Sequence, residues 1–301
     1  MSLASPRTRL LSYSAGGRRS FGLIDPSGTA VIDLGDRLGT FADLAALIAS
    51  GEVADTVGPF ADQPGDMPID QITFERVVDR PGKILCIGVN YGGRTAEYAD
   101  RSDAEYPSVF VRFPESLVGH EQPIVRPAES DQLDYEGEIV AVIGRAGRRI
   151  PVEHARQHLA GLTLGNEGSV RDWLRHAKFN VTQGKNWEAS GSLGPWLVPV
   201  GELPEFEALE LSTHVNGELR QRDTPATMKY SIEYQVSYLS TFVTLQPGDL
   251  IFTGTPIGAG ARFDPPRWLV PGDVVEVSVP ELGTLRNVVA DDPQRARGGS
   301  S

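Results

Sequence analysis

Residues 131–144 (DQLDYEGEIVAVIG) place acidic side chains at alternate positions ahead of an apolar run. Alternate side chains on a strand share one face, so Asp134, Glu136 and Glu138 would lie on the side that continues into the apolar run. At a rise of about 3.3 Å per residue, the backbones of Glu136 and Glu138 are about 6.6 Å apart, so their carboxylates can converge. Negative charges that lead onto an apolar face are costly unless a positive charge compensates them. If this face is buried, a positive charge would have to lie beside the strand.

Most other apolar runs are also typical of strands. Residues 8–34 alternate short apolar runs with turns and predict a strand meander. The chain lacks the strand–helix alternation of a doubly wound fold, so we expect an α+β class that is mainly β. Four helices are predicted: 40–51 with Thr40 as N-cap and Gly51 as the stop, 151–160, 169–177 with Ser169 and Asp172 at capping-box spacing, and 231–243.

A Pro- and Asp-rich stretch, residues 58–68, is the predicted linker between two domains. We expect a small N-terminal α/β domain at 1–78 and a larger catalytic domain at 79–292. Residues 293–301 are rich in Gly and Ser and predict a disordered tail.

The overall charge and cysteine content narrow the class of partner. The 301 residues carry a net charge of −12, which argues against nucleic acid because no basic field exists to neutralise phosphate. Cys86 is the only cysteine, so no intrachain disulfide can form, and we expect a buried thiol in a reducing compartment. We find neither an apolar run of membrane-spanning length nor a leader, and we expect a cytoplasmic protein with no membrane partner.

A third acidic residue, Glu167 in TLGNEGSVRDW, could complete a metal site with Glu136 and Glu138. Hard oxygen ligands point to Mg²⁺ or Mn²⁺, with Ca²⁺ as a further candidate. From these residues alone, a solvated strand face is an open alternative. We expect Asp134, at the start of the strand, to be either exposed or in contact with the ligands rather than a ligand itself. His154 and His158 have the spacing of a metal pair on a helix, but we find no third ligand and expect a surface face.

Seven motifs occur between Lys83 and Val289 in the order GVNYGGRTAE, YEGEIVAVIG, GNEGSVRDW, GKNWEASGSLGPWLV, VNGELRQ, GDLIFTGTPIGAG and PGDVVEVSV. In this order the chain closely resembles the fumarylacetoacetate hydrolase family, in particular its bacterial acylpyruvate hydrolase and 2-hydroxyhepta-2,4-diene-1,7-dioate isomerase branch. The resemblance implies a mixed β-roll that forms a homodimer and binds Mg²⁺ or Mn²⁺. The implied metal ligands are Glu136, Glu138 and, in a position usually held by Asp, Glu167.

The resemblance also implies roles around that ion. Lys185 would lie near the developing oxyanion, and Gln183, on the same side if the segment is extended, could donate a hydrogen bond to a substrate oxygen. Thr255, through its hydroxyl and backbone N–H, and Tyr91 would contact the substrate. Arg112 would be either an anion contact or a structural ion pair.

The sequence departs from the family at the catalytic base. The usual pattern after Asn-Tyr supplies a His–Glu dyad, whereas here Glu97 is present and Arg94 stands in the place of the histidine. An arginine, with a pKa above about 12, does not accept a proton near neutrality. Glu97 alone could polarise water, His120 could enter the site, or the reaction could dispense with a water nucleophile. Arg94 could instead clamp a second carboxylate on the substrate.

Three functions remain open at this stage. The first is a metal-dependent hydrolase that cleaves a carbon–carbon bond in an acylpyruvate or related diketo acid. The second is a decarboxylase of a 2-oxo diacid resembling oxaloacetate, or an enol or double-bond isomerase. The third is a non-catalytic relative that binds a metal and a small acid.

Overall fold

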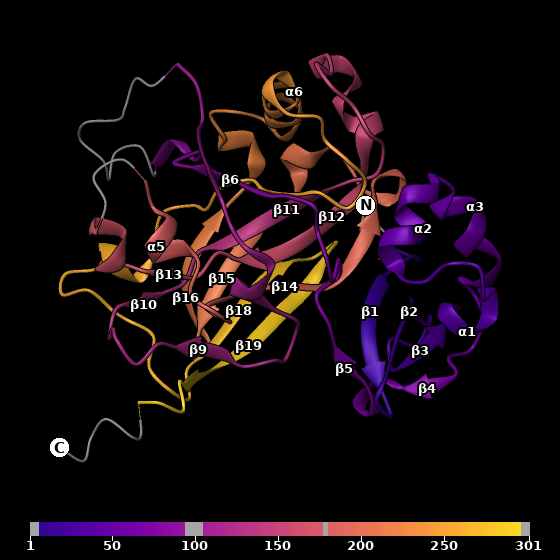
Figure 1. The fold of residues 1–301 in the computed structure, drawn as a ribbon, viewed down its shortest axis with the longest axis horizontal. Helices are drawn as coiled ribbons and strands as arrows, with labels where there is room; N and C mark the ends of the chain where they lie inside the picture. The colour runs from indigo at the N-terminus through magenta and orange to yellow at the C-terminus, as the bar shows by residue number, and fades with distance from the viewer. Residues whose placement is uncertain (1–5, 94–104, 177–179, 296–301) are drawn as a thin grey trace.

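The computed structural model describes residues 6–93, 105–176 and 180–295, and strands dominate this part of the chain (Figure 1). The larger sheet has twelve described strands. Its main path runs in the order β4 (Met67–Pro68), β3 (Ala30–Asp33), β2 (Arg18–Ile24), β1 (Leu10–Ala15), β14 (Gly191–Pro199), β12 (Leu159–Asn166), β11 (Gly137–Ile143), β17 (Leu250–Phe252), β6 (Ile84–Gly88) and β7 (Ser108–Val111). In addition, β5 (Thr73–Phe74) pairs with β1, and β8 (Leu117–Val118) pairs with β14.

A second sheet of five strands covers the middle of the first. Its order is β16 (Glu218–Asp223), β15 (Leu211–Val215), β18 (Val274–Val279), β19 (Gly283–Asp291) and β9 (Ile124–Arg126). It packs on β11, β12 and β14 through β15, β18 and β19. A short ladder of β10 (Leu133–Asp134) with β13 (Ser169–Val170) lies beside this pair of sheets. The arrangement confirms the predicted α+β, mainly β, class.

Gly137 explains how closely the two sheets approach. It points away from the face that carries Glu136 and Glu138, toward β15. A Cβ atom at this position would lie 2.0 Å from Thr213 Oγ1, which is far inside van der Waals contact. The glycine between the two glutamates is therefore needed for the packing of one sheet on the other.

The N-terminal strands are part of the larger sheet, because β1 pairs with β14 at Leu10 and Leu197. One buried cluster includes Leu23 and Leu47 from the N-terminal region together with Val140 and Leu250 from the main body. Three short helices, α1 (Leu34–Leu38), α2 (Leu44–Ser50) and α3 (Val53–Val57), lie on the outside of these strands (Figure 1). The division near residue 78 stays a prediction.

Two helix predictions hold in part or in full. The helix predicted at 231–243 is confirmed as α6 (Ile232–Phe242), where the Ser231 hydroxyl accepts a hydrogen bond from the Tyr234 N–H. The helix predicted at 40–51 begins later, at Leu44, because the Asp43 carboxylate caps it by accepting from the Ala46 N–H. Thr40 was therefore the wrong N-cap. Gly51, at φ 74°, ends the helix as predicted.

The two remaining helix predictions were wrong in type. Residues 152–158 form a 3₁₀ helix, η4 (Val152–His158), rather than an α-helix. Ser169 lies in β13 and pairs with Asp134, so it caps no helix. Asp172 instead caps the short 3₁₀ turn η5 (Trp173–Arg175). A further described α-helix, α5 (Thr182–Lys185), is a single turn.

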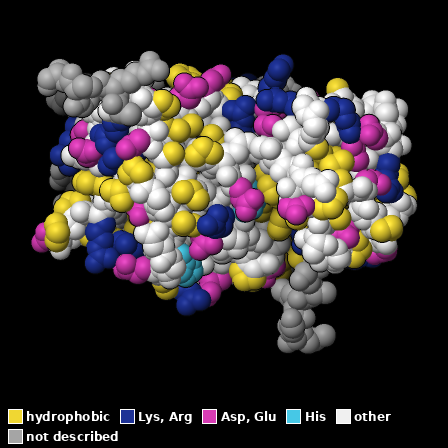
Figure 2. Space-filling model, turned by 90° about the horizontal axis from the view of Figure 1, so that it is seen from below, with side chains coloured by type: hydrophobic (Ala, Val, Ile, Leu, Met, Phe, Trp, Pro, Cys, Tyr) yellow, Lys and Arg dark blue, Asp and Glu magenta, His cyan; other side chains and the backbone are white. Residues whose placement is uncertain are grey.

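Side chains of both charges are mixed over the face seen in Figure 2, with hydrophobic side chains scattered among them. Lys and Arg do not gather there into one field of the kind that attracts phosphate. None of the described helices has the length and hydropathy that a bilayer crossing requires.

Candidate active site

The antiparallel pairing of β11 with β12 brings the three predicted metal ligands to one end of the sheet. Gly137 pairs with Asn166, so Glu136, Glu138 and Glu167 lie around the same strand ends. The Glu167 N–H donates to the Glu136 carbonyl oxygen at 2.7 Å. The three side chains are only 3 %, 1 % and 2 % exposed, in that order. A solvated strand face is therefore wrong for these residues.

Lys185, at the end of α5, supplies the positive charge that the strand requires. Its Nζ donates to Glu136 and, at 3.0 Å, to Glu167 Oε2. It also lies 5.2 Å from the centre of the Phe110 ring. Burial opposes the charge on Lys185, but Glu136 and then Glu167 outweigh that effect and hold its pKa above the ordinary value. The ammonium group is fixed between two carboxylates.

Arg171 forms a second ionic link to the same cluster. Its Nε donates to Asp134 Oδ2 and its Nη2 to Glu136 Oε1, both at 2.8 Å. Asp134 is fully buried and also accepts from the N–H groups of Gly260, at 2.7 Å, and Ala261, at 3.0 Å. Of the two alternatives for Asp134, the structure supports the indirect role, in which it orients Arg171 and fixes the 260–261 turn.

Arg112 is engaged on every side by protein groups. Its Nη1 donates to the Gly168 carbonyl oxygen at 2.8 Å, its Nε to Ser116 Oγ at 3.0 Å, and its Nη2 to Ser190 Oγ at 3.1 Å. Its Nη1 lies 3.6 Å from Glu167 Oε1. This geometry supports a structural ion pair rather than an anion contact for Arg112.

Gln221, on β16, joins the second sheet to the acidic strand, although sequence analysis did not select it. Its Oε1 accepts from the Gly137 N–H at 3.0 Å, and its Nε2 donates to Thr255 Oγ1 at 2.8 Å and to the Pro256 carbonyl oxygen at 2.9 Å. The Thr255 hydroxyl donates to the Gly137 carbonyl oxygen at 2.8 Å. The only sequence signal for Gln221 was its place at the end of the motif VNGELRQ.

The turn that carries Thr255 also contacts Glu138. The Gly254 N–H donates to Glu138 Oε2 at 2.8 Å. Gly254 has φ 106°, and a Cβ there would lie 2.7 Å from that of Asn90, so only glycine fits. Thr255 is buried, and its backbone N–H donates no hydrogen bond within the described residues. This N–H remains available to a ligand.

The cluster has more negative than positive groups. Four carboxylates, Asp134, Glu136, Glu138 and Glu167, face three cations, Arg112, Arg171 and Lys185. Burial raises the pKa of Glu138 well above its ordinary value, and the charges of Glu167 and Glu136 add to this effect. Among the residues that the structure describes, one carboxylate in the cluster therefore lacks a compensating charge.

The donors in this cluster fit a hard divalent cation. Glu167 Oε1 is buried and has no hydrogen-bond partner among the described residues, and no Lys or Arg of the cluster forms an ion pair with Glu138. Within the described ranges, no three acidic, histidine or cysteine side chains are poised as they stand to ligate an ion. Lys185 Nζ lies between two of the three carboxylates, those of Glu136 and Glu167. Carboxylate oxygens are the ligands that Mg²⁺, Mn²⁺ and Ca²⁺ prefer.

The other predicted residues have mixed outcomes. Tyr91 is fully buried, its hydroxyl has no hydrogen-bond partner in the described part of the chain, and burial followed by the charges of Glu138 and Asp223 raises its pKa. The segment of Gln183 is helical rather than extended, so the prediction that Gln183 shares the side of Lys185 was wrong, and its side chain is exposed. Arg94 and Glu97 lie outside the described residues.

The single cysteine has the predicted environment. Cys86, on β6, is fully buried, and burial raises the pKa of its thiol well above the ordinary value. It is a packed apolar side chain in this fold.

No histidine reaches the acidic cluster in the part of the chain that the structure describes, which includes all five of them. His120 was a candidate base, but its Nδ1 accepts from the Arg286 N–H at 3.0 Å and its ring packs edge-on against Phe74 at 4.7 Å. Burial lowers the pKa of His120 to about 4. His154 and His158 lie on η4 and form no contact with the three glutamates. His154 is exposed and His158 is half-buried, and the expectation that they are not metal ligands stays a prediction.

The fold, with three carboxylates at one end of its sheet, can be compared with those of known protein families. The family model described as fumarylacetoacetate (FAA) hydrolase, C-terminal, matches residues 83–290. The chain belongs to this family, as the motifs predicted.

Individual relatives extend the comparison. Oxaloacetate tautomerase YisK of Bacillus subtilis (strain 168) is 38% identical over 225 residues, which cover 73% of this chain and 74% of that protein. The structure of a probable 2-hydroxyhepta-2,4-diene-1,7-dioate isomerase from Mycobacterium abscessus has a TM-score of 0.78 and 32% identity, covering 94% of this chain and 99% of that one. Maleylpyruvate hydrolase from Sphingobium sp. SYK-6, solved with manganese(II) and pyruvate, shares the fold at a TM-score of 0.77 and 23% identity, with 94% and 99% covered. The proteins that this chain is similar to are thus named as a tautomerase and a probable isomerase, and a hydrolase shares its fold.

Proposed function

We propose that this protein is an enol–keto tautomerase that acts on a small 2-oxo diacid resembling oxaloacetate. This is the isomerase branch of the second hypothesis, and the names of similar relatives favour it over the first. Tautomerisation moves a proton from the enol oxygen to the neighbouring carbon. It consumes no water and breaks no carbon–carbon bond.

The proposal rests on one observation: among the described residues, the buried ionic cluster contains no histidine. Hydrolysis needs a base that activates water against a carbonyl. In the described residues the cluster contains carboxylates, Lys185 and two arginines, and in the sequence Arg94 replaces the family histidine. A reaction that needs no water nucleophile suits this set best.

Glu136, Glu138 and Glu167 would hold the divalent cation, with Mg²⁺ or Mn²⁺ as the candidates and Ca²⁺ as a third. When bound, such an ion stabilises the negative charge that forms on an enolate oxygen. The manganese(II) ion in the maleylpyruvate hydrolase complex supports a divalent ion.

This chain's own residues would orient the substrate and move the proton. The Lys185 ammonium group places a fixed positive charge beside the carboxylates, where an enolate oxygen would bind. The free backbone N–H of Thr255 would donate to a substrate carboxylate. The hydroxyl of Tyr91 is buried, and the charge of Glu138 contributes to its raised pKa. We assign proton transfer to Glu97 and the clamp on the second carboxylate to Arg94. Gln183 is a peripheral candidate because it is exposed.

The proposal is tested by following the loss of enol absorbance of oxaloacetate with purified protein and Mn²⁺. The wild type should accelerate tautomerisation at least about a hundredfold over buffer, and Lys185→Met should lose most of this rate. Thr182→Ala, an exposed change on the same helix, should leave the rate unchanged. Equal rates for wild type and Lys185→Met would refute the assigned role.

Product analysis separates this proposal from the other hypotheses. A decarboxylase would release carbon dioxide, and a hydrolase would convert acylpyruvates into two acids. We expect neither product from the wild type. Because Arg94→His restores the family base, we expect acylpyruvate hydrolysis only in that variant. Hydrolysis of acylpyruvates by the wild type at a rate above its tautomerase rate would overturn the proposal.

We also propose a homodimer and a cytoplasmic location. The dimer rests on the family resemblance, and the location rests on the single buried cysteine. Gel filtration with light scattering would check the former.

A further inference from the structure

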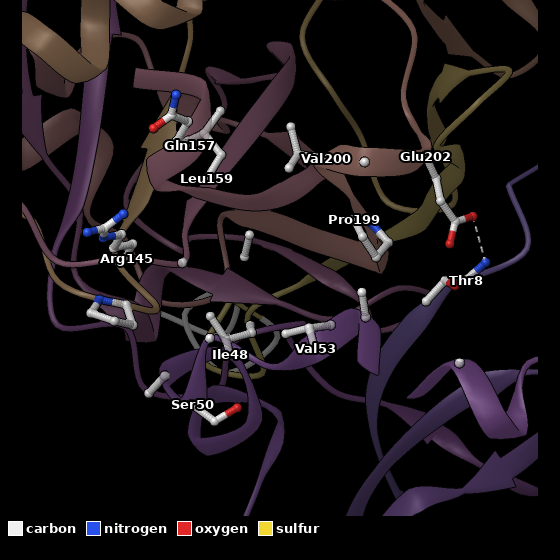
Figure 3. Close-up of a pocket in the computed structure, with 18 of the residues that line it drawn as sticks. Thr8, Ile48, Ser50, Val53, Arg145, Gln157, Leu159, Pro199, Val200 and Glu202 are labelled. Atoms are coloured by element: carbon white, nitrogen blue, oxygen red, sulfur yellow. Dashed lines mark hydrogen bonds between the residues drawn. The ribbon is translucent and has the colours of Figure 1, made fainter. Parts of the chain in front are cut away.

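A cavity of about 820 Å³ opens between the N-terminal helices and the main body (Figure 3). Its lining residues come from α2, α3, the β11–η4 connection, the start of β12 and the end of β14. None of them belongs to the acidic cluster. Cavities of this size at the junction of two structural units are where proteins commonly bind small molecules.

The middle of the cavity is apolar on both sides. Figure 3 shows Ile48 and Val53 along one wall, with Leu159, Pro199 and Val200 along the other. Alanine and glycine make up much of the remaining lining and leave space between the two walls. This middle part suits a hydrocarbon chain or ring.

One end of the cavity is lined by polar groups that already have partners. The Thr8 N–H and the Arg7 N–H donate to Glu202 Oε2 at 3.0 and 2.7 Å (Figure 3 draws the first). The Arg7 guanidinium pairs with Asp62. The carboxylate of Glu202 makes this end unfavourable for an anion.

The opposite end carries the positive charge of Arg145. Arg145 and Gln157 both lie on the left of Figure 3, on the side away from Glu202. The Arg145 backbone is held by its N–H, which donates to the His158 carbonyl oxygen at 3.1 Å. Its guanidinium has neither a hydrogen bond nor an ion pair in the ranges that the structure describes.

We propose that this cavity binds a small monocarboxylate with an apolar body, its carboxylate on Arg145 and its body between the two apolar walls. A planar guanidinium binds a carboxylate through two parallel hydrogen bonds. A diacid would place its second charge near Glu202, so the substrate class of the active site is disfavoured here. The inference does not depend on the proposed tautomerase activity.

The site is tested by isothermal calorimetry on the full chain with octanoate and 4-phenylbutyrate, with octanol and succinate as comparison ligands. Both monocarboxylates should bind with submillimolar Kd, and octanol and succinate at least about tenfold more weakly. Arg145→Gln should weaken octanoate about tenfold, the scale of one charge-assisted contact at a partly exposed site. Arg148→Gln, which removes a nearby exposed arginine outside the cavity, should not.

A second variant tests the apolar part independently. Ala54→Trp should fill the cavity and abolish octanoate binding, with its melting temperature reporting that the fold is retained. Absence of binding by both monocarboxylates at millimolar concentration would overturn the inference. Octanoate affinity that is unchanged in Arg145→Gln would overturn it as well, and that exposed substitution should not disturb folding.

Discussion

Gln221→Leu should destabilise the fold far more than a surface substitution on the same strand. Gln221 is 1 % exposed and bonds with Gly137, Thr255 and Pro256. Leucine has a similar volume but neither donates nor accepts. The substitution therefore removes three buried hydrogen bonds without opening a large cavity.

The size of the effect follows from the groups left behind. The Gly137 N–H and the Pro256 carbonyl oxygen each lose a partner, whereas the Thr255 hydroxyl keeps its bond to the Gly137 carbonyl oxygen. A buried polar group without a partner costs about 1–3 kcal/mol. Two such groups predict a loss of about 2–6 kcal/mol in the free energy of unfolding, a large share of the roughly 5–15 kcal/mol typical of a domain.

Urea unfolding followed by tryptophan fluorescence, in the presence of a chelator, measures this loss. The matched control is Arg222→Leu on the next residue, whose side chain is 59 % exposed and pairs with exposed Glu210. The control should lose less than about 1 kcal/mol. A loss of that same small size for Gln221→Leu would refute the view that Gln221 ties the second sheet to the acidic strand.

Two further predictions concern pH and metal. Because burial lowers the folded-state pKa of His120 to about 4 from 6.5, its contribution to stability is complete above pH 6.5 and is lost as the pH falls toward 4. Between about pH 7 and 4.5 the wild type should lose about 1–3 kcal/mol more than His120→Asn, and parallel curves from chemical unfolding would contradict this. Glu136→Ala should remove most of the Mn²⁺ affinity, since two carboxylates cannot complete the coordination, whereas Glu153→Ala on the exposed surface should not. Calorimetry showing unchanged Mn²⁺ binding in Glu136→Ala would refute the assigned ligand set.

The strands and the acidic cluster were predictable because their sequence patterns are local, and because uncompensated charge on a buried strand is energetically unfavourable. Alternating carboxylates on an apolar strand required a cation, and the structure supplies Lys185 at that place. The family resemblance named Glu136, Glu138 and Glu167, and the antiparallel pairing of β11 with β12 brings these three together.

Features that depend on tertiary contacts were less accessible from the sequence. Ser169 has a capping-box spacing, but pairing of its backbone with Asp134 overrides the local preference for a helix. Gln183 was placed beside Lys185 on the assumption of an extended segment, whereas the two residues lie within one helical turn. Gln221 lies on another sheet, so only the packing of the two sheets reveals its role.

The joining of β1 to β14 has a consequence for engineering this protein. A truncated chain that begins near residue 79 would leave the β14 edge without its antiparallel neighbour and would expose the apolar side chains that Leu23 and Leu47 now cover. Such a fragment would be prone to aggregate through that edge. Chimeras between relatives should therefore exchange the N-terminal region only together with the strand that receives it.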